Sequence, residues 1–437
     1  MSKKVVLDTS IPIYDIEWIS KFQDLQDIEE VIIPSVVHEE INILKEENSE
    51  RGYYARKVAE QLDELSQISP LRQGVKIGNI LIRTSYKIEN KEIKQSLIMD
   101  KNDYKIIACA KNENAILISR DRMMRVLARD FVKAEDYEAD MIKTEIYKGY
   151  RKIIVPENKI ELLYREKLEN EYGLYPNEFV IMESEWNPQH VGIGICKKNR
   201  ILPVYFDKMN FKGMKLRPRN LEQKMFLYLL LDPEVLCVSA LGTAGRGKTL
   251  LPVDYAFSSI DNKLANKLYY TKPTIAIDSK EELGFYPGSL NDKLKPHFQP
   301  LYSAVEEIFK EDLYRASQRI SVDQKVEQLI NEDILMFFPL AHIRGMSIFD
   351  KRVILDEGQN TNRHTMKSIV TRLTDTSKLI VTGDVDQIDD RNLNRYNNGM
   401  IHLIETGKEE DFIGHITLDI DNRNQRGRLA EFGARKL

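Results

Sequence analysis

A glycine-rich segment, Gly242–Thr249 with the sequence GTAGRGKT, constrains the fold of this 437-residue chain more than any other feature. It closely follows a short apolar run, Val235–Val238, that predicts a buried strand. The spacing of its glycines and its final Lys-Thr pair are typical of a loop whose backbone N–H groups surround a phosphate. Such a loop joins a strand to the N-terminus of a helix, whose dipole adds to the attraction. The segment therefore predicts an α/β domain that binds a nucleotide.

Every residue of this loop is a candidate ligand of ATP. Lys248 is expected to reach the β- and γ-phosphates, and Thr249 is expected to hold Mg²⁺. The complete set of loop candidates is Gly242, Thr243, Ala244, Gly245, Arg246, Gly247, Lys248 and Thr249. The competing interpretation, a glycine turn without a nucleotide, is disfavoured by the strand that precedes the loop.

Two further apolar runs end in polar residues that suit ATP hydrolysis. The first ends in Asp356 and Glu357, where Asp356 is expected to bind Mg²⁺ behind Thr249 and Glu357 to act as the general base on the attacking water. The second is followed by Asp384 and Gln387, which are candidate sensors of the γ-phosphate. Each run could instead end in an ordinary solvated turn, and only the pairing with the glycine loop favours the functional interpretation.

Four acidic residues lie where strands end or helices begin in the first third of the chain: Asp8, Glu40, Asp103 and Asp121. In an open α/β sheet such positions converge at the carboxyl edge of the strands. Clustered carboxylates repel one another unless they surround a cation, and Mg²⁺ or Mn²⁺ suits a site made only of oxygen ligands. Such an ion would activate water for attack on a phosphodiester. The chain has 68 acidic residues, so spacing alone leaves scattered surface acids as the alternative.

The pattern along the chain predicts three segments, because 437 residues exceed one ordinary hydrophobic core. Residues 1–145 alternate between strand and helix patterns, which predicts a mostly parallel sheet. Residues 146–215 contain short apolar runs separated by Asn, Pro, Lys and Gly, which predicts a β-rich module. Residues 216–437 return to α/β alternation around the glycine loop.

Composition restricts the partners and the compartment. The net charge of −4 does not by itself indicate a nucleic-acid partner, although a local basic surface would suffice for one. The three cysteines, Cys109, Cys196 and Cys237, are far apart, so neither a disulfide framework nor a zinc site is expected. No apolar stretch is long enough to cross a membrane. A cytoplasmic protein without a membrane partner is therefore expected.

The sequence around the four acids resembles the PIN nuclease domain. The four matching segments are Val6–Ser10, Val37–Ile41, Asn102–Ile106 and Ile118–Asp121. PIN domains are metal-dependent ribonucleases, so the resemblance implies that Asp8, Glu40, Asp103 and Asp121 bind Mg²⁺ or Mn²⁺ and cleave single-stranded RNA.

The last segment resembles the PhoH family of ATPases. The segment Pro218–Gln223 is similar to the family's sequence ahead of the loop, which implies that Gln223 reads the adenine edge. The other matching segments are Gly284–Gly288, Ile343–Gly345, Asp356–Asn360, Leu379–Asp384, Gln387–Asp389 and Arg426–Ala430. Lys272 precedes Pro273 where the family usually has Arg, and the two cations differ in their phosphate contacts.

A PIN domain fused to a PhoH domain is a known architecture, and Ala134–Tyr137 resembles its junction. The resemblance implies an enzyme in which ATP hydrolysis unwinds or translocates RNA and the PIN domain cleaves it. It also implies a homo-oligomeric ring, commonly a hexamer, in which an Arg from a neighbour completes the ATP site. Arg426 is the first candidate for that Arg, and Arg344 or Arg372 is the second.

Two alternatives remain open from the sequence. One is an ATP-driven RNA helicase or switch whose PIN domain only binds RNA. The other is a PIN module that only binds a partner protein, as in toxin–antitoxin pairs.

Overall fold

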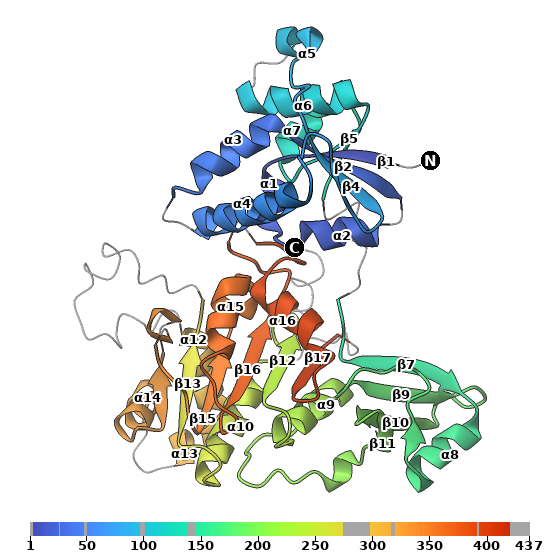
Figure 1. The fold of residues 1–437 in the computed structure, drawn as a ribbon. Coiled ribbons are helices and arrows are strands. Elements are labelled where there is room, and N and C mark those ends of the chain that lie inside the picture. Colours follow the sequence, from blue (N-terminus) through green and yellow to red (C-terminus); the bar gives the residue numbers. More distant parts are fainter. Residues whose placement is uncertain are drawn as a thin grey trace. The chain divides into compact units, whose positions relative to one another are not determined.

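The computed structural model describes residues 3–25, 27–47, 50–96, 101–137, 146–273, 298–315, 320–338, 340–343, 345–390 and 393–419. The chain divides into two compact units, Met1–Glu145 and Ile146–Leu437 (Figure 1).

The first unit is built around a six-stranded sheet with strand order β3-β4-β2-β1-β5-β6. Its strands are β1 (Lys3–Leu7), β2 (Ile28–Pro34), β3 (Val75–Ile77), β4 (Ile80–Ser85), β5 (Ile116–Ile118) and β6 (Ala134–Glu135). All neighbours are parallel except β3 and β4, which form an antiparallel pair. The helices are α1 (Ser10–Tyr14), α2 (Trp18–Asp24), α3 (Ser35–Leu44), α4 (Glu50–Ile68), α5 (Lys91–Ser96), α6 (Lys101–Glu113) and α7 (Arg122–Ala128). The apolar runs Val5–Leu7 and Val31–Ile33 are buried in its core.

The second unit contains an all-parallel sheet with strand order β14-β13-β15-β16-β12-β17. Its strands are β12 (Cys237–Leu241), β13 (Lys267–Thr271), β14 (Leu335–Phe337), β15 (Lys351–Leu355), β16 (Lys378–Gly383) and β17 (Ile413–Thr417). The principal helices are α9 (Leu221–Leu231), α10 (Leu250–Asp261), α12 (Gln299–Ile308), α13 (Lys310–Arg315), α14 (Val322–Asn331), α15 (Arg363–Val370) and α16 (Gly399–Gly407).

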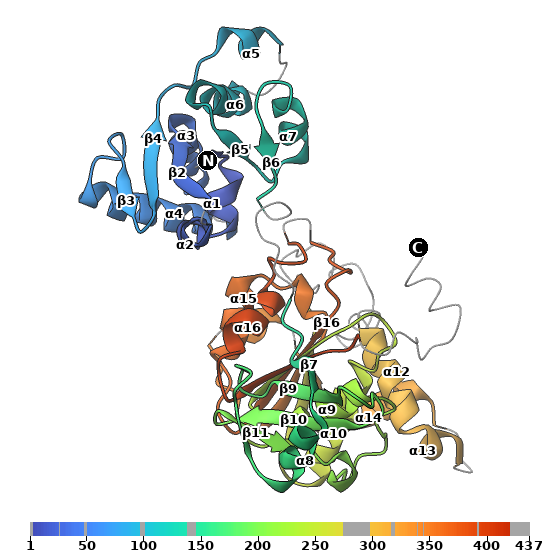
Figure 2. The same ribbon diagram turned by 90° about the vertical axis from the view of Figure 1, so that its right-hand side faces the viewer.

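Successive side chains of a strand point to opposite faces of the sheet, and here both faces are covered by helices. Val238 and Ala240 of β12 pack into one core cluster with α9, α10, α12 and α14. Cys237 and Leu241 of the same strand pack into another cluster with α15 and α16. Figure 2 shows α15 and α16 on one side of β16 and α12 on the other. A strand buried on both faces needs a nearly continuous apolar run, and β12 has one apart from the buried Ser239.

A second sheet of this unit has the order β7-β9-β10-β11-β8 and is antiparallel except for the β7–β9 pair. It comprises β7 (Tyr150–Val155), β8 (Leu168–Glu169), β9 (Phe179–Ser184), β10 (Val191–Lys197) and β11 (Arg200–Pro203), with α8 (Glu157–Arg165) beside them. Phe179 and Ile195 share a core cluster with Met225 and Phe226 of α9. This sheet therefore packs against α9 within the same unit, while the boundary at residue 215 stays a prediction.

The predicted mixed α/β architecture with parallel sheets is confirmed, with small shifts of element bounds. The strand before the glycine loop was expected at Val235–Val238 and lies at Cys237–Leu241. Val235 instead belongs to the turn after α9, where its N–H donates to the Asp232 carbonyl. Among the helices that the structure describes, none is long and apolar enough to cross a membrane.

Buried His415 of β17 predicts a pH dependence of stability. Its Nδ1 and Nε2 lie 2.8 and 3.0 Å from the hydroxyls of Ser239 and Thr417, and burial lowers its pKa to about 3. Since the unfolded residue has a pKa of about 6.5, only the unfolded chain binds this proton between these values. As the pH falls from 6.5 to 5, His415 should therefore lower the free energy of unfolding by about 2 kcal/mol.

The measurement is the urea midpoint of unfolding, followed by circular dichroism, at pH 7.5 and pH 5 in the full-length chain. His415→Leu should be less stable than wild type at pH 7.5 but lose less stability on acidification. His364→Leu, at an exposed position, is the matched control and should lose as much stability as wild type between pH 7.5 and pH 5. An equal loss of stability between pH 7.5 and pH 5 in His415→Leu and wild type would contradict the prediction.

Candidate functional site

The glycine loop Gly242–Thr249 connects β12 to α10, as its sequence predicts. Gly245 and Gly247 have φ of +83° and +84°, a region that favours glycine. A Cβ on Gly247 would also lie 2.9 Å from the Gln223 amide nitrogen. Lys248 is buried, and its Nζ donates to the Gly242 carbonyl at 2.6 Å. The loop thus has the turned backbone and the buried cation that a phosphate site requires.

Arg246 of the loop is also buried, although it carries a permanent charge. Its Nη1 has no hydrogen-bond partner among the described residues. A buried donor without a partner is costly, so an anion beside the loop would relieve it. This orphaned guanidinium nitrogen is an independent sign that the loop fits a phosphate ligand.

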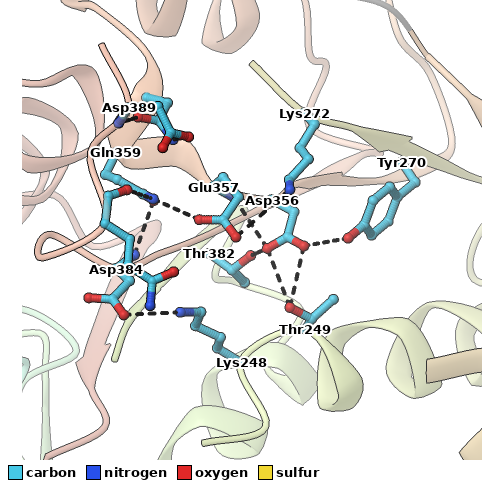
Figure 3. Close-up of polar contacts among 12 residues, drawn as sticks. Lys248, Thr249, Tyr270, Lys272, Asp356, Glu357, Gln359, Thr382, Asp384 and Asp389 are labelled. Carbon is cyan, nitrogen blue, oxygen red and sulfur yellow. Dashed lines mark hydrogen bonds and ion pairs between the residues drawn. The ribbon is translucent and has the colours of Figure 1, made fainter. Parts of the chain in front are cut away.

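The candidate metal-binding half of the site lies at the ends of neighbouring parallel strands (Figure 3). The Thr249 hydroxyl lies 3.3 and 3.4 Å from the two carboxylate oxygens of Asp356, which follows β15. Thr382 of β16 donates to Asp356 Oδ1 at 2.6 Å, and Tyr270 of β13 donates to Oδ2. A hydroxyl paired with a buried carboxylate is the donor set that fits Mg²⁺ beside a nucleotide.

Tyr270 is a site residue that sequence reasoning missed. Burial, together with the Asp356 carboxylate, holds the pKa of Tyr270 well above its usual range, so the phenol stays protonated and donates. Its strand is next to β15, with Thr271 opposite Leu355 in the register. Tyr270 reaches Asp356 through this strand register, and no motif in the sequence around Tyr270 indicates the contact.

Glu357 has the left-handed backbone conformation, with φ of 57°, which is uncommon for a residue with a side chain. Its Oε2 accepts a hydrogen bond of 2.7 Å from Gln359, and its Oε1 lies 3.9 Å from the Lys272 ammonium (Figure 3). Unusual backbone at a strand end is typical of functional positions. The candidate general base is therefore held from both sides.

The candidate γ-phosphate sensors lie where β16 ends. Asp384 is buried, and its Oδ2 lies 3.9 Å from Lys248 Nζ. Burial raises the pKa of Asp384, while the Lys248 charge opposes that shift. Gln387 is exposed and joins this network through its backbone carbonyl, which accepts from Gln359 at 2.7 Å. Sensing by these two residues stays a prediction.

Gln223, on α9, forms a hydrogen bond with the glycine loop. Its Nε2 donates to the Arg246 carbonyl at 2.9 Å, and its Oε1 accepts from the Arg219 N–H at 2.8 Å. The side chain is buried. This geometry places Gln223 between the phosphate loop and the preceding segment, and its contact with adenine stays a prediction.

In the first unit, Asp8 and Glu40 form an acidic pair. Asp8 follows β1, is buried, and accepts hydrogen bonds from Ser10 at 2.6 Å and Ser119 at 2.8 Å. Glu40, on α3, accepts from the Thr9 hydroxyl. Burial and, less strongly, the Glu40 charge raise the pKa of Asp8, while the serine hydrogen bonds lower it. Two carboxylates in mutual repulsion have the charge that a cation would balance.

The other two predicted metal ligands of this unit are Asp121 and Asp103. Asp121 caps α7, where its Oδ1 accepts from the N–H groups of Met123 and Met124 at 2.7 and 3.0 Å. Its own N–H donates to Ser119, the partner of Asp8. Asp103 lies in the first turn of α6. Within the described ranges, no group of three or more His, Cys, Asp or Glu side chains could hold a metal ion. The four-acid metal set therefore stays a prediction.

Several predicted positions lie outside the described residues: Arg344, Arg426 and Gly284–Gly288. Arg372 is described and follows α15. Its Nε is buried and has no hydrogen-bond partner within the part of the chain that the structure describes. The structure therefore does not distinguish among the three candidate arginines.

Comparison with known proteins identifies two domains in the chain. Residues 5–138 match the family model described as PIN domain, and residues 215–431 match that described as PhoH-like protein. Protein PhoH2 of Bacillus subtilis (strain 168) is 30% identical over 459 residues, covering 99% of each chain. Protein PhoH2 of Thermobispora bispora is 28% identical, covering 98% of this chain and 95% of the relative. The chain belongs to the PhoH2 family, with an N-terminal PIN domain and a C-terminal PhoH domain of the P-loop ATPase type.

Proposed function

We propose that this chain is an ATP-dependent RNA-processing enzyme. The observation that carries the ATPase half is the contact between Thr249 and Asp356 beside a glycine loop with a buried lysine. In the proposed site the loop N–H groups and Lys248 bind the phosphates of ATP, and Thr249 and Asp356 hold Mg²⁺. The ion supplies positive charge that neutralises the phosphate oxygens.

Glu357 is proposed as the general base that orients the attacking water. Its carboxylate is next to Asp356 in sequence, and Lys272 and Gln359 hold its two oxygens. Asp384 contacts Lys248, so the loop after β16 is suited to sense the γ-phosphate. Energy from this hydrolysis is proposed to unwind RNA or translocate along it.

The PIN domain is proposed to cleave single-stranded RNA with Mg²⁺ or Mn²⁺. The support is the match of residues 5–138 to the PIN model and the buried Asp8 next to Glu40. Asp103 and Asp121 are proposed to join the site when it is loaded. We also propose that the chain forms a homo-oligomeric ring, commonly a hexamer. In this ring Arg426, Arg344 or Arg372 would contact the ATP bound by a neighbouring subunit. The proposed location is the cytoplasm.

A second candidate is an ATP-driven helicase or switch whose PIN domain only binds RNA. It is favoured by the engagement of Asp121 as a helix cap. A nuclease assay with Mn²⁺ and no ATP distinguishes the two, because a working nuclease site should cut RNA without the motor.

The ATPase half is tested with Lys248→Ala. We expect loss of ATP hydrolysis on the order of 10²-fold or more, because the variant lacks the buried cation that stabilises phosphate charge. The rate is measured with and without RNA of defined sequence, and the RNA products are mapped. Lys310→Ala, at an exposed lysine, is the matched control. ATP hydrolysis by Lys248→Ala at the wild-type rate would refute the assignment of the loop.

A further inference from the structure

A buried glutamine, Gln359, connects the two halves of the candidate ATP-hydrolysing site. It lies in the short 3-10 helix η4 (Gly358–Asn360) and has no exposed surface. Its Nε2 donates to Glu357 Oε2 and to the Gln387 carbonyl, both at 2.7 Å. Its Oε1 accepts from the Asp384 N–H at 3.0 Å (Figure 3). One amide therefore joins the candidate base to the loop after β16.

Close packing fixes the orientation of this amide. A Cβ on Gly383 would lie 2.6 Å from Gln359 Oε1 and 2.6 Å from the Met400 sulfur. A Cβ on Gly358 would lie 2.5 Å from a methyl group of Val381. Glycine at both positions allows the turn after β15 to sit directly against the end of β16. A side chain confined in this way has one orientation available, which suits a residue that aims another group.

The opposite oxygen of Glu357 has its own neighbour. Oε1 lies 3.9 Å from the Lys272 ammonium, while Oε2 accepts from Gln359. A carboxylate that orients an attacking water must keep its direction, since a displacement of about 1 Å can cost about 100-fold in rate. Gln359 provides the shorter of these two contacts, and its side chain is fully buried.

We propose that Gln359 is a positioning residue that aims the Glu357 carboxylate and couples its direction to the Asp384–Gln387 loop. This inference rests on the proposed ATPase function. Asp384 lies 3.9 Å from the phosphate-binding Lys248. A change at the γ-phosphate that shifts this loop therefore reaches Glu357 through a single side chain.

The test is Gln359→Glu, which keeps the shape and the acceptor for the Asp384 N–H but replaces the donor that faces Glu357. We expect kcat for ATP hydrolysis at pH 8 to fall about 10- to 100-fold, with KM for ATP within about twofold of wild type. In a Glu357→Gln background the same substitution should slow single-turnover hydrolysis less than twofold. A residue that acts only through Glu357 has nothing left to position once that carboxylate is gone.

Gln328→Glu is the matched control, because Gln328 also donates to a carboxylate, that of Glu332 at 2.7 Å, but on the exposed face of α14. It should hydrolyse ATP at the wild-type rate. If Gln359→Glu is recovered unfolded, Gln359→Met, which is similar in volume, replaces it and is measured alone and together with Glu357→Gln.

Wild-type kcat in Gln359→Glu, or an equal loss in the presence and absence of the Glu357 carboxylate, would overturn the inference. Loss of activity through a raised KM and a lowered thermal midpoint would also overturn it, in favour of a purely structural role. Absence of ATP hydrolysis by the wild-type chain would instead overturn the proposed function, and the inference with it.

Discussion

We expect the proposed RNA cleavage by the full-length chain to fall by about 10³-fold or more in Asp8→Asn, while ATP hydrolysis should stay within about twofold of wild type. Asp8 is a buried carboxylate of the PIN domain, its charge interacts with that of Glu40, and it is a proposed ligand of the divalent ion. The substitution preserves size and leaves an oxygen to accept from Ser119. It removes the negative charge, and with it the attraction for the ion that activates water.

The measurement is cleavage of labelled single-stranded RNA with Mn²⁺, in parallel with phosphate release from ATP. Asp63→Asn, at an exposed position on α4 of the same unit, is the matched control and should cut RNA normally. Cleavage by Asp8→Asn at the wild-type rate would show that the nuclease site has been placed wrongly. Loss of both activities would indicate a folding defect instead.

Glu357→Gln should bind ATP with near wild-type affinity yet hydrolyse it about 10²- to 10³-fold more slowly. The amide is too weak a base to accept a proton from water, whereas the proposed phosphate and metal ligands Lys248, Thr249 and Asp356 are unchanged. Because the amide can present its oxygen to Gln359, the local fold should be retained. The variant should therefore accumulate bound ATP, unlike Lys248→Ala, which should lose phosphate contacts.

Binding is measured with a fluorescent ATP analogue and hydrolysis in a single turnover. Glu327→Gln, at an exposed position on α14, is the control. If Glu357→Gln hydrolyses ATP within about threefold of the wild-type rate, another group is the base, and the role assigned to the carboxylate after Asp356 is wrong.

Residues that are contiguous in the chain could be predicted well. The loop Gly242–Thr249 specifies its own conformation through two glycines at positive φ, so its pattern alone predicted a strand-to-helix turn. The buried strands β15 and β16 could be read as unbroken apolar runs. Asp356 could be paired with Thr249 across 107 residues because both follow parallel strands of one sheet.

Contacts between strands could not be predicted. Tyr270 and Thr382 reach Asp356 only because β13, β15 and β16 are neighbours in a particular register. Their strands carry no local pattern that distinguishes these two hydroxyls from others. The amide of Gln359 likewise acquires its partners from the close approach of two turns.

The two candidate sites differ in how far the chain alone specified them. For the ATPase site, the glycine loop at residues 242–249 determined a phosphate-binding turn by itself, because glycine spacing acts over adjacent residues. From spacing alone, the acids of the PIN domain were only residue types where strands end or helices begin, and their role was implied by the resemblance. The tertiary structure brought Asp8 and Glu40 together and used Asp121 as a helix cap, because side-chain partners depend on packing between distant elements. The same packing decided which neighbours hold Glu357.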